Sequence, residues 1–258
     1  MSELDAWESL NPIKVVGAGD WHGNGNFAVR AVRYAADQGA DVILHVGDFA
    51  FDFAPKYMAA LQRALEDTGL TLGFVSGNHD SYDYLDKREA EHGCTAIPLR
   101  PNIYYLPRCY RWSWNGIRFL AMGGAVSVDR QWRIPGREWW DRETITFREA
   151  QKATDDGLVD VMICHDVPAG VHIPGIAGNP HGFPQREIDA SEQHRYLLRQ
   201  IVDQVQPKLV FSGHYHCRHT GILHGDGYTS EVHILDCDGA EFDDNMTVVD
   251  LGLLANGV

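Results

Sequence analysis

Seven side chains that can bind a divalent metal ion follow five short apolar runs of the sequence. They are, in chain order, Asp20, His22, Asp48, Asn78, His165, His214 and His216. Carboxylate and amide oxygens combined with imidazole nitrogens suit divalent Mn, Fe, Zn, Ni or Co. Because the set needs no cysteine thiolate, it does not predict a structural zinc site.

The number of these ligands predicts two ions rather than one. Seven groups exceed the four that a tetrahedral ion binds, and a carboxylate such as that of Asp48 can bridge a pair. Two divalent ions about 3.5–4 Å apart can hold a hydroxide between them and neutralise phosphate oxygens. We expect two divalent ions, with manganese preferred over iron, zinc, nickel and cobalt.

The net charge of the chain fits a site that carries its own cations. With 22 basic and 36 acidic residues, the formal charge is −14. This charge disfavours general binding to nucleic acid or to an anionic membrane, and it would repel an anionic substrate. Bound metal ions would attract that substrate.

The stretch Ser76-Gly77-Asn78-His79-Asp80 places an imidazole and a carboxylate beside a predicted ligand. A polar triplet on a loop is in itself more typical of turn and capping chemistry. Its weight comes from the other strand ends, which carry the same kinds of groups. We interpret His79 as a proton donor and Asp80 as its orienting partner.

Strands and helices alternate through the first 95 residues. Apolar runs at 13–18, 41–46 and 72–75 each end in a polar group, and helical patterns follow at about 26–38, 55–67 and 81–89. This order predicts a parallel sheet with right-handed crossovers. Ligands in such sheets bind beyond the carboxyl ends of the strands.

The second half of the chain predicts further strands. Segments 102–106 and 109–114 alternate, and the Asn115-Gly116 turn leads into a strand at 117–122. Runs at 158–164 and 208–211 precede the remaining histidine ligands, with a helix at 187–205 between them. A Gly225-Asp226-Gly227 turn predicts that the end of the chain forms an antiparallel closing sheet. Without a repeat or linker, residues 1–258 are expected to form one domain.

An insert at about 123–148 is rich in Arg and Trp. Segment 100–148 contains nine Arg and four acidic residues, a local charge of +5 (9 − 4). Arginines among aromatic rings can hold an anionic or base-bearing ligand, and we assign Arg130 and Arg133 to substrate binding. The alternative is that the Trp residues cap a sheet and the Arg residues pair with surface acids.

A Pro- and Gly-rich loop at 168–184 is long for a compact domain and is predicted to form a lid or rim. Its His172 and His181 are assigned to substrate binding, and His219 is a further candidate. His45, inside a strand, is interpreted as a core residue. The remaining histidines are interpreted as surface or sheet residues: His92, His194, His224 and His233.

Composition places the chain among globular enzymes, with 44% hydrophobic and 22% charged residues. Residues 1–14 lack the apolar region of a signal peptide, and no apolar run of about 18 residues predicts a membrane span. Five cysteines without a CxxC spacing predict a reduced, cytoplasmic chain.

The ordered motifs resemble those of the calcineurin-like metallophosphoesterases. That family's signature is D-x-H, G-D, G-N-H-[DE], a lone H and G-H-x-H. The sequence has Asp20-Trp21-His22, Gly47-Asp48, Gly77-Asn78-His79-Asp80, His165 and Gly213-His214-Tyr215-His216. The resemblance covers about residues 13–220. It implies an α/β fold in which two mixed β-sheets pack as a sandwich flanked by helices.

The resemblance also implies ligand assignments and a mechanism. It assigns Asp20, His22 and His216 to the first ion and Asn78, His165 and His214 to the second, with Asp48 between them. It implies that a metal-bound hydroxide attacks phosphorus. His79 then protonates the leaving oxygen, supported by Asp80.

One departure narrows the expected activity. Protein Ser/Thr phosphatases of the family carry G-D-x-x-D-R-G, whereas this chain has Gly47-Asp48-Phe49-Ala50-Phe51-Asp52-Phe53. The Arg that would grip a phosphoprotein is absent there. The chain is more similar to the bacterial and phage-type phosphodiesterases.

We therefore expect a hydrolase of phosphodiesters, either cyclic nucleotides or other small nucleotide-type diesters. Alternatives are a phosphomonoesterase, a nuclease, and a metal-binding scaffold without catalysis, although such scaffolds usually lack some ligands that are present here. The expected partner is a small phosphate ester, without membrane or strong nucleic-acid binding. The insert could set specificity or form a homo-oligomer contact.

Overall fold

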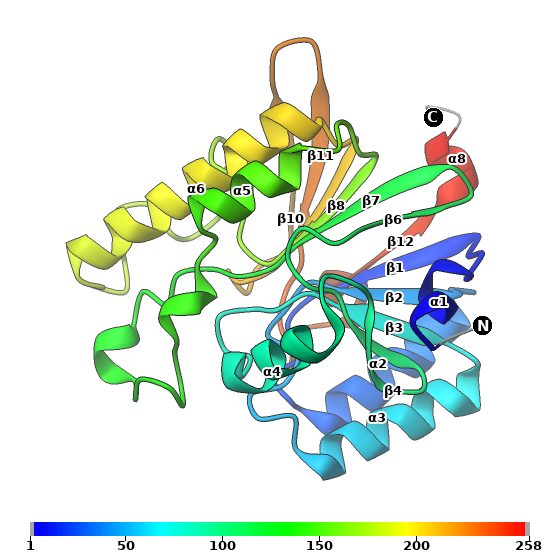
Figure 1. The fold of residues 1–258 in the computed structure, drawn as a ribbon. Coiled ribbons are helices and arrows are strands. Elements are labelled where there is room, and N and C mark those ends of the chain that lie inside the picture. Colours follow the sequence, from blue (N-terminus) through cyan, green and yellow to red (C-terminus); the bar gives the residue numbers. More distant parts are fainter. Residues whose placement is uncertain (1–2, 256–258) are drawn as a thin grey trace.

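Two six-stranded sheets face each other in the computed structural model, which describes residues 3–255 (Figure 1). The first sheet has the order β12 (Met246–Asp250), β1 (Lys14–Ala18), β2 (Val42–His45), β3 (Thr71–Phe74), β5 (Ile103–Tyr105) and β4 (Ile97–Arg100). The second has the order β10 (His219–His224), β11 (Thr229–Ile234), β9 (Leu209–Ser212), β8 (Val161–Cys164), β7 (Ile117–Met122) and β6 (Arg111–Trp114). The predicted α/β fold of two mixed sheets is confirmed.

Helices cover the outer faces of this sandwich (Figure 1). The longer ones are α2 (Gly25–Asp37), α3 (Pro55–Thr68), α4 (Tyr82–His92), α5 (Phe147–Thr154) and α6 (Gln185–Val205). The shorter helical elements are α1 (Glu3–Glu8), α7 (Phe242–Asn245), α8 (Leu251–Ala255) and the 3-10 turns η1 (Arg130–Trp132) and η2 (Asp141–Glu143). Of these, α1 and α8 insert Trp7 and Leu251 into the core between the sheets. Within residues 3–255, no helix is both long and apolar enough to cross a membrane.

Three apolar cores separate four layers of secondary structure. Alternate residues of β1 face opposite ways, so that Val16 packs against α2 and α3 whereas Val15 packs between the sheets. Leu120 of β7 packs against α5 and α6 in the third core. Because both faces of each sheet are covered, the central strands are buried along their length, as in the run Val42–His45.

The central strands of each sheet run in parallel, which brings their carboxyl ends to one edge. β1, β2 and β3 are parallel neighbours in the first sheet. β7, β8 and β9 are parallel neighbours in the second. Polar residues that directly follow these strands are therefore collected at a common edge of the sandwich.

The end of the chain differs from the predicted antiparallel closing sheet. β10 and β11 form an antiparallel hairpin, as the Gly225-Asp226-Gly227 turn predicts. However, β11 is parallel to β9, and β12 crosses to the other sheet to pair with β1. The last strands therefore extend both sheets instead of forming a sheet of their own.

The insert contains little regular structure. Between β7 and α5, residues 123–146 form only η1, η2 and an isolated bridge between Pro135 and Trp139. The short helix α5 lies outside the predicted elements. It begins with a capping box, in which the Thr146 hydroxyl and the Glu149 carboxylate each accept a backbone N–H at the helix start.

Candidate metal centre

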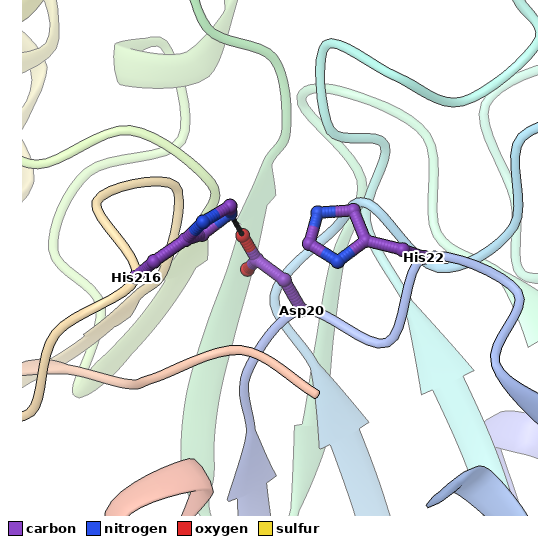
Figure 2. A group of neighbouring side chains, drawn as sticks. All are labelled: Asp20, His22 and His216. Carbon is purple, nitrogen blue, oxygen red and sulfur yellow. Dashed lines mark ion pairs between the residues drawn. The ribbon is translucent and has the colours of Figure 1, made fainter. Parts of the chain in front are cut away.

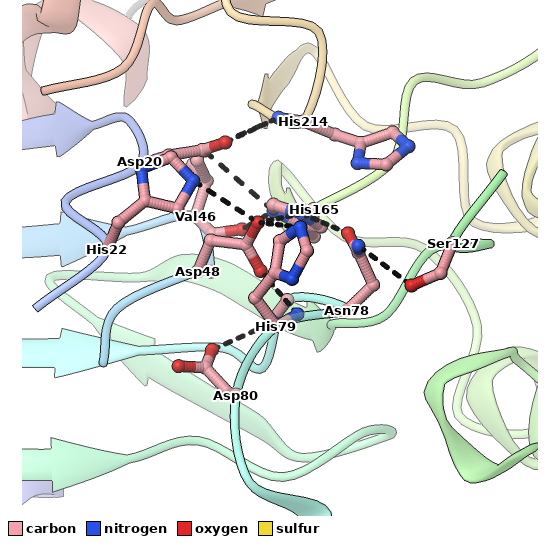
Figure 3. Close-up of polar contacts among 12 residues, drawn as sticks. Asp20, His22, Val46, Asp48, Asn78, His79, Asp80, Ser127, His165 and His214 are labelled. Atoms are coloured by element: carbon pink, nitrogen blue, oxygen red, sulfur yellow. Dashed lines mark hydrogen bonds and ion pairs between the residues drawn. The ribbon is translucent and has the colours of Figure 1, made fainter. Parts of the chain in front are cut away.

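Five strand ends bring the seven predicted ligands to one place. Asp20 and His22 follow β1, Asp48 follows β2, Asn78 follows β3, His165 follows β8, and His214 and His216 follow β9. These strands belong to both sheets, so the group lies where the two carboxyl-end edges meet (Figure 3). Asp20, Asp48, Asn78 and His165 are at most 2% exposed.

The first group of ligands is Asp20, His22 and His216 (Figure 2). Each offers one ligand atom, and these atoms lie within 4.8 Å of one another. His216 Nε2 lies 3.3 Å from Asp20 Oδ2. His22 Nε2 also lies 3.6 Å from Asp48 Oδ2, which connects this group to the second one.

The second group centres on His165 (Figure 3). Its Nε2 lies 3.5 Å from Asp48 Oδ2 and 3.0 Å from Asn78 Oδ1. Asp20, Asp48 and His165 also bring three ligand atoms within 4.8 Å of one another. The ring of His214 is centred 5.1 Å from that of His165. The assignment of individual ligands to either ion stays a prediction.

The hydrogen bonds of the imidazoles leave electron pairs that face one another. His165 Nδ1 lies 3.0 Å from the carbonyl oxygen of Val46, which can only accept. The proton therefore sits on Nδ1, and Nε2 turns its lone pair toward the oxygens of Asp48 and Asn78. Facing lone pairs repel unless a cation or a proton lies between them, so the donor set fits a divalent ion.

The pKa values of His165 and Asp48 indicate that positive charge is favoured between these side chains. Burial disfavours the charged form of His165, but the nearby carboxylates of Asp48 and Asp20 raise its pKa to about 9. His165 also holds the pKa of Asp48 well below its ordinary value, against the effect of burial. Two buried carboxylates thus favour a cation at this point.

Four of the seven ligands have left-handed backbone conformations. Their φ angles are 46° at His22, 49° at Asp48, 69° at His214 and 47° at His216. Such angles are uncommon outside glycine and cluster at functional sites, where the surrounding structure enforces them. The four residues owe their side-chain directions to this unusual backbone.

Close backbone approach explains the glycine of the Gly77-Asn78 pair. A Cβ added at Gly77 would lie 2.1 Å from Asp48 Oδ1. The same Oδ1 accepts a hydrogen bond from the backbone N–H of His79 at 2.8 Å. The absence of a side chain therefore lets the loop after β3 enclose the Asp48 carboxylate.

Asp80 connects two ligand-bearing loops. Its buried carboxylate accepts hydrogen bonds from the backbone N–H groups of Gly77 at 2.8 Å, Ala50 at 2.7 Å and Phe49 at 3.3 Å. It points away from the His79 ring (Figure 3). The geometry gives Asp80 a positioning part, and its predicted support of His79 stays a prediction.

His79 lies at the rim of the centre. Its Nε2 is 3.9 Å from Asp48 Oδ2. Arg133 of the insert places Nη1 2.6 Å from His79 Nδ1 and Nη2 3.1 Å from Nε2. Asp129 holds that guanidinium through two contacts of 2.6 Å. Burial lowers the pKa of His79, Asp48 opposes this effect, and Arg133 adds to it.

The other predicted substrate residues lie apart from the ligands. Arg130 Nε is 2.6 Å from the buried carboxylate of Glu187. The rings of His172 and His181 contact those of His219 and Phe183, respectively. Within residues 3–255, Arg130, His172 and His181 make no hydrogen bond, ion pair or ring contact with a predicted ligand. Their substrate contacts stay predictions.

His194 differs from its interpretation as a surface or sheet residue. It lies on α6, is 5% exposed, and places Nδ1 2.6 Å from Asp166 Oδ2. Tyr215 donates its hydroxyl to Asp166 Oδ1 at 3.1 Å. Because Asp166 follows His165 and Tyr215 follows His214, these contacts connect two ligand loops to α6. By contrast, His45 is fully buried, as predicted.

Two residues of the site lie outside the sequence motifs. Asp238, on the loop between β11 and α7, lies 2.7 Å from His22 Nδ1. Phe51, 48% exposed, stacks near the ring of His22 at 5.8 Å and meets that of His79 edge-on at 5.7 Å. Phe51 could have been found from the sequence, because it lies just after Gly47-Asp48, where the chain differs from the protein phosphatase motif.

Comparison with known proteins gives a sequence match over most of the chain. A sequence model described as calcineurin-like phosphoesterase matches residues 13–218. A lariat debranching enzyme of Entamoeba histolytica is 23% identical over 159 residues, which cover 58% of this chain and 43% of that protein. The chain thus spans less than half the length of this relative.

Solved structures share the fold. The protein TT1561 of Thermus thermophilus superposes with a TM-score of 0.53 at 15% identity, covering 95% of this chain and 96% of its own. A dimetal phosphatase from Danio rerio gives a TM-score of 0.56 at 11% identity, covering 92% of each chain. At such identities the likeness concerns the fold alone.

Proposed function

Because the chain belongs to the calcineurin-like phosphoesterase family, which indicates a metal-dependent phosphoesterase, we propose that it hydrolyses small nucleotide-type phosphodiesters, including cyclic nucleotides. The observation that carries this proposal is the exposed ring of Phe51 beside both His22 and His79. An exposed aromatic ring at the rim of a phosphate site offers a face on which a nucleobase can stack.

The metal centre would be held by the seven ligands. When bound, two divalent ions would neutralise phosphate oxygens and activate the attacking water. Asp20 and Asp48 supply the buried negative charge that holds them, and His165 contributes Nε2. Asp238 fixes the proton of His22 on Nδ1, which leaves Nε2 free as a ligand.

Arg133 lies against both ring nitrogens of His79, with Nη1 2.6 Å from Nδ1 and Nη2 3.1 Å from Nε2. His79 Nε2 also lies 3.9 Å from Asp48 Oδ2, at the rim of the centre. In its protonated form, His79 would give a proton to the leaving oxygen and become neutral, a contribution of about 10²–10⁴-fold to the rate.

Arg133 also supplies a cation that the phosphatase motif would otherwise provide. In this chain Phe51 and Asp52 occupy the motif positions of the phosphatase Asp and Arg. Arg133 reaches the rim from the insert instead, with its side chain 24% exposed. It is therefore placed to bind a phosphate oxygen, while Phe51 contacts the organic part of the ester.

A substrate comparison tests the proposal. Purified protein with Mn²⁺ should cleave bis-p-nitrophenyl phosphate faster than p-nitrophenyl phosphate, and it should cleave at least one 2′,3′- or 3′,5′-cyclic nucleotide. Much faster cleavage of the monoester would contradict the diester preference and favour a phosphomonoesterase. Cleavage of single-stranded DNA at a rate that falls with salt would favour the nuclease.

A further inference from the structure

The insert contacts the metal centre at a second point, through the amide of Asn78 (Figure 3). Asn78 Oδ1 lies 3.0 Å from His165 Nε2, on the side where an ion would bind. On the opposite side, Asn78 Nδ2 donates a hydrogen bond to Ser127 Oγ at 3.1 Å. Both Asn78 and Ser127 are at most 2% exposed, so water does not substitute for either contact.

Ser127 is itself held by a buried carboxylate. Its backbone N–H donates to Glu143 Oε1 at 2.7 Å, and its hydroxyl donates to Oε2 at 2.9 Å. Glu143 is 1% exposed. Because its only hydroxyl proton goes to Glu143, Ser127 Oγ can act only as an acceptor toward Asn78. While Glu143 is ionised, the direction of every hydrogen bond in this series is therefore fixed.

This fixed direction decides which end of the Asn78 amide faces the ion. The two ends have nearly the same shape, but only the oxygen has lone pairs, whereas the nitrogen has two protons. A rotated amide would turn N–H groups toward the ion and its oxygen toward Ser127 Oγ. With both Oγ and the amide oxygen as acceptors, that contact is repulsive as long as Glu143 takes the hydroxyl proton.

We propose that Ser127 and Glu143 are positioning residues that hold the Asn78 oxygen toward the second ion and so set the affinity of that ion. The proposal rests on the dimetal function argued above. A buried carboxylate is costly unless its partners compensate, and Glu143 directs both of its oxygens to one serine. The insert thereby acts on metal binding as well as on the rim that Arg133 forms.

Metal binding tests the proposal without a measurement of activity. Mn²⁺ titrated into the metal-free full chain should show two binding events. In Ser127→Ala, one of the two events, that of the second ion, should lose about 10–100-fold in affinity, the usual effect of removing a partner of a ligand. Glu143→Gln should act in the same direction. The glutamine amide has only one oxygen, so it cannot accept hydrogen bonds from the Ser127 N–H and hydroxyl at two separate oxygens, as Glu143 does.

A change at Asn78 separates orientation from general damage. Asn78→Asp replaces the amide by a carboxylate, whose two oxygens are equivalent after rotation. In that background, Ser127→Ala should have little further effect on Mn²⁺ affinity. A merely structural role would make Ser127→Ala weaken Mn²⁺ binding equally in both backgrounds, and that result would overturn the proposal.

Glu138→Gln is the matched control within the insert, since Glu138 accepts a hydrogen bond from the Ile134 backbone N–H and does not contact Ser127. It should leave both binding events unchanged. Two events in the unmodified protein with no change in Ser127→Ala and Glu143→Gln would refute the positioning role alone. A single event in the unmodified protein would instead refute the dimetal function on which it rests.

Discussion

His22 and Asp238 lie in direct contact, with His22 Nδ1 2.7 Å from Asp238 Oδ1, although 216 residues separate them in the sequence. Asp238 also accepts a hydrogen bond from Asn24 Nδ2 at 2.7 Å, and its backbone N–H donates to the Asp20 carbonyl at 2.8 Å. The loop between β11 and α7 therefore encloses the first ligand group. Its carboxylate orients the imidazole that the D-x-H motif supplies.

Loss of this contact should weaken the binding of the first ion. We expect Asp238→Asn to lower the Mn²⁺ affinity of one of the two binding events by about 10–100-fold, because a neutral amide no longer fixes the His22 ring as firmly. Isothermal titration of the metal-free protein measures this change. Asp226→Asn, at an exposed turn, is the control. Unchanged affinity in Asp238→Asn would show that His22 needs no such support.

His79 should be required for turnover but not for metal binding. His79→Ala is expected to lower kcat by about 10²–10⁴-fold for a substrate with an alkoxide leaving group, which must be protonated. The loss should be smaller for bis-p-nitrophenyl phosphate, because nitrophenolate leaves without a proton. Metal content measured in parallel should stay at the level of the unmodified protein.

An equal loss for both leaving groups would argue against a proton donor at His79. His224→Ala provides the control, since His224 is an exposed residue of β10. This variant should keep the turnover of the unmodified protein for both substrates.

The sequence predicts where the proposed ligands lie because they directly follow strand ends. Parallel strands must place their carboxyl ends at one edge, so a motif such as Asp48 after a buried run has a foreseeable position. No comparable rule exists for Asp238 or for the contact between Ser127 and Glu143. Their positions depend on the path of the loops that connect strands and helices. Neither the period of the hydrophobic residues nor the spacing of the motifs predicts that path.

Charge composition alone is also a poor guide to side-chain direction. The local excess of Arg in the insert suggests several substrate cations, yet Arg130 pairs with Glu187 and Arg142 pairs with Asp83. This supports the alternative of structural ion pairs for those two residues. Arg133 differs because its side chain contacts His79, a fact that only the tertiary structure reveals.

Arg133 and Arg130 form a natural pair of test positions. Arg133→Ala should lower kcat/KM for a diester, because the rim loses the cation that contacts His79. Arg130→Ala should leave KM unchanged and lower the free energy of unfolding, since Glu187 would lose one ion-pair partner and keep Arg186. Steady-state kinetics and thermal unfolding of both variants measure this. A higher KM in Arg130→Ala would instead support the predicted contact between Arg130 and the substrate.

Phe51 should contribute to nucleotide binding. We expect Phe51→Ala to raise KM for a cleaved cyclic nucleotide by roughly 5–150-fold, as base–aromatic stacking contributes about 1–3 kcal/mol per base. The kcat should change less, because the ring lies beside the reacting groups and not among them. Phe147→Ala, an equally drastic change at a 74% exposed ring of α5, serves as the control. Equal KM values in Phe51→Ala and the unmodified protein would show that Phe51 does not stack on the base.

Burial of Glu143 should make the stability of the metal-free protein depend on pH. Burial raises the pKa of Glu143 from 4.5 to about 7, against the opposing hydrogen bonds from Ser127. The folded state thus binds this proton more tightly than the unfolded state does. The stability contributed by protonated Glu143 is fully present below pH 4.5 and is lost as the pH rises toward about 7.

Glu143→Gln removes this dependence because an amide does not titrate. The Tm of the variant relative to the unmodified protein should therefore increase as the pH rises from about 5 to 8. Thermal unfolding in the presence of a chelator measures the difference, and Glu138→Gln should give a difference that does not vary with pH. A constant difference in Glu143→Gln as well would mean that the buried carboxyl keeps its proton, or loses it, throughout this range. In that case the hydrogen bonds to Ser127 would have the same strength at every pH at which the enzyme is assayed.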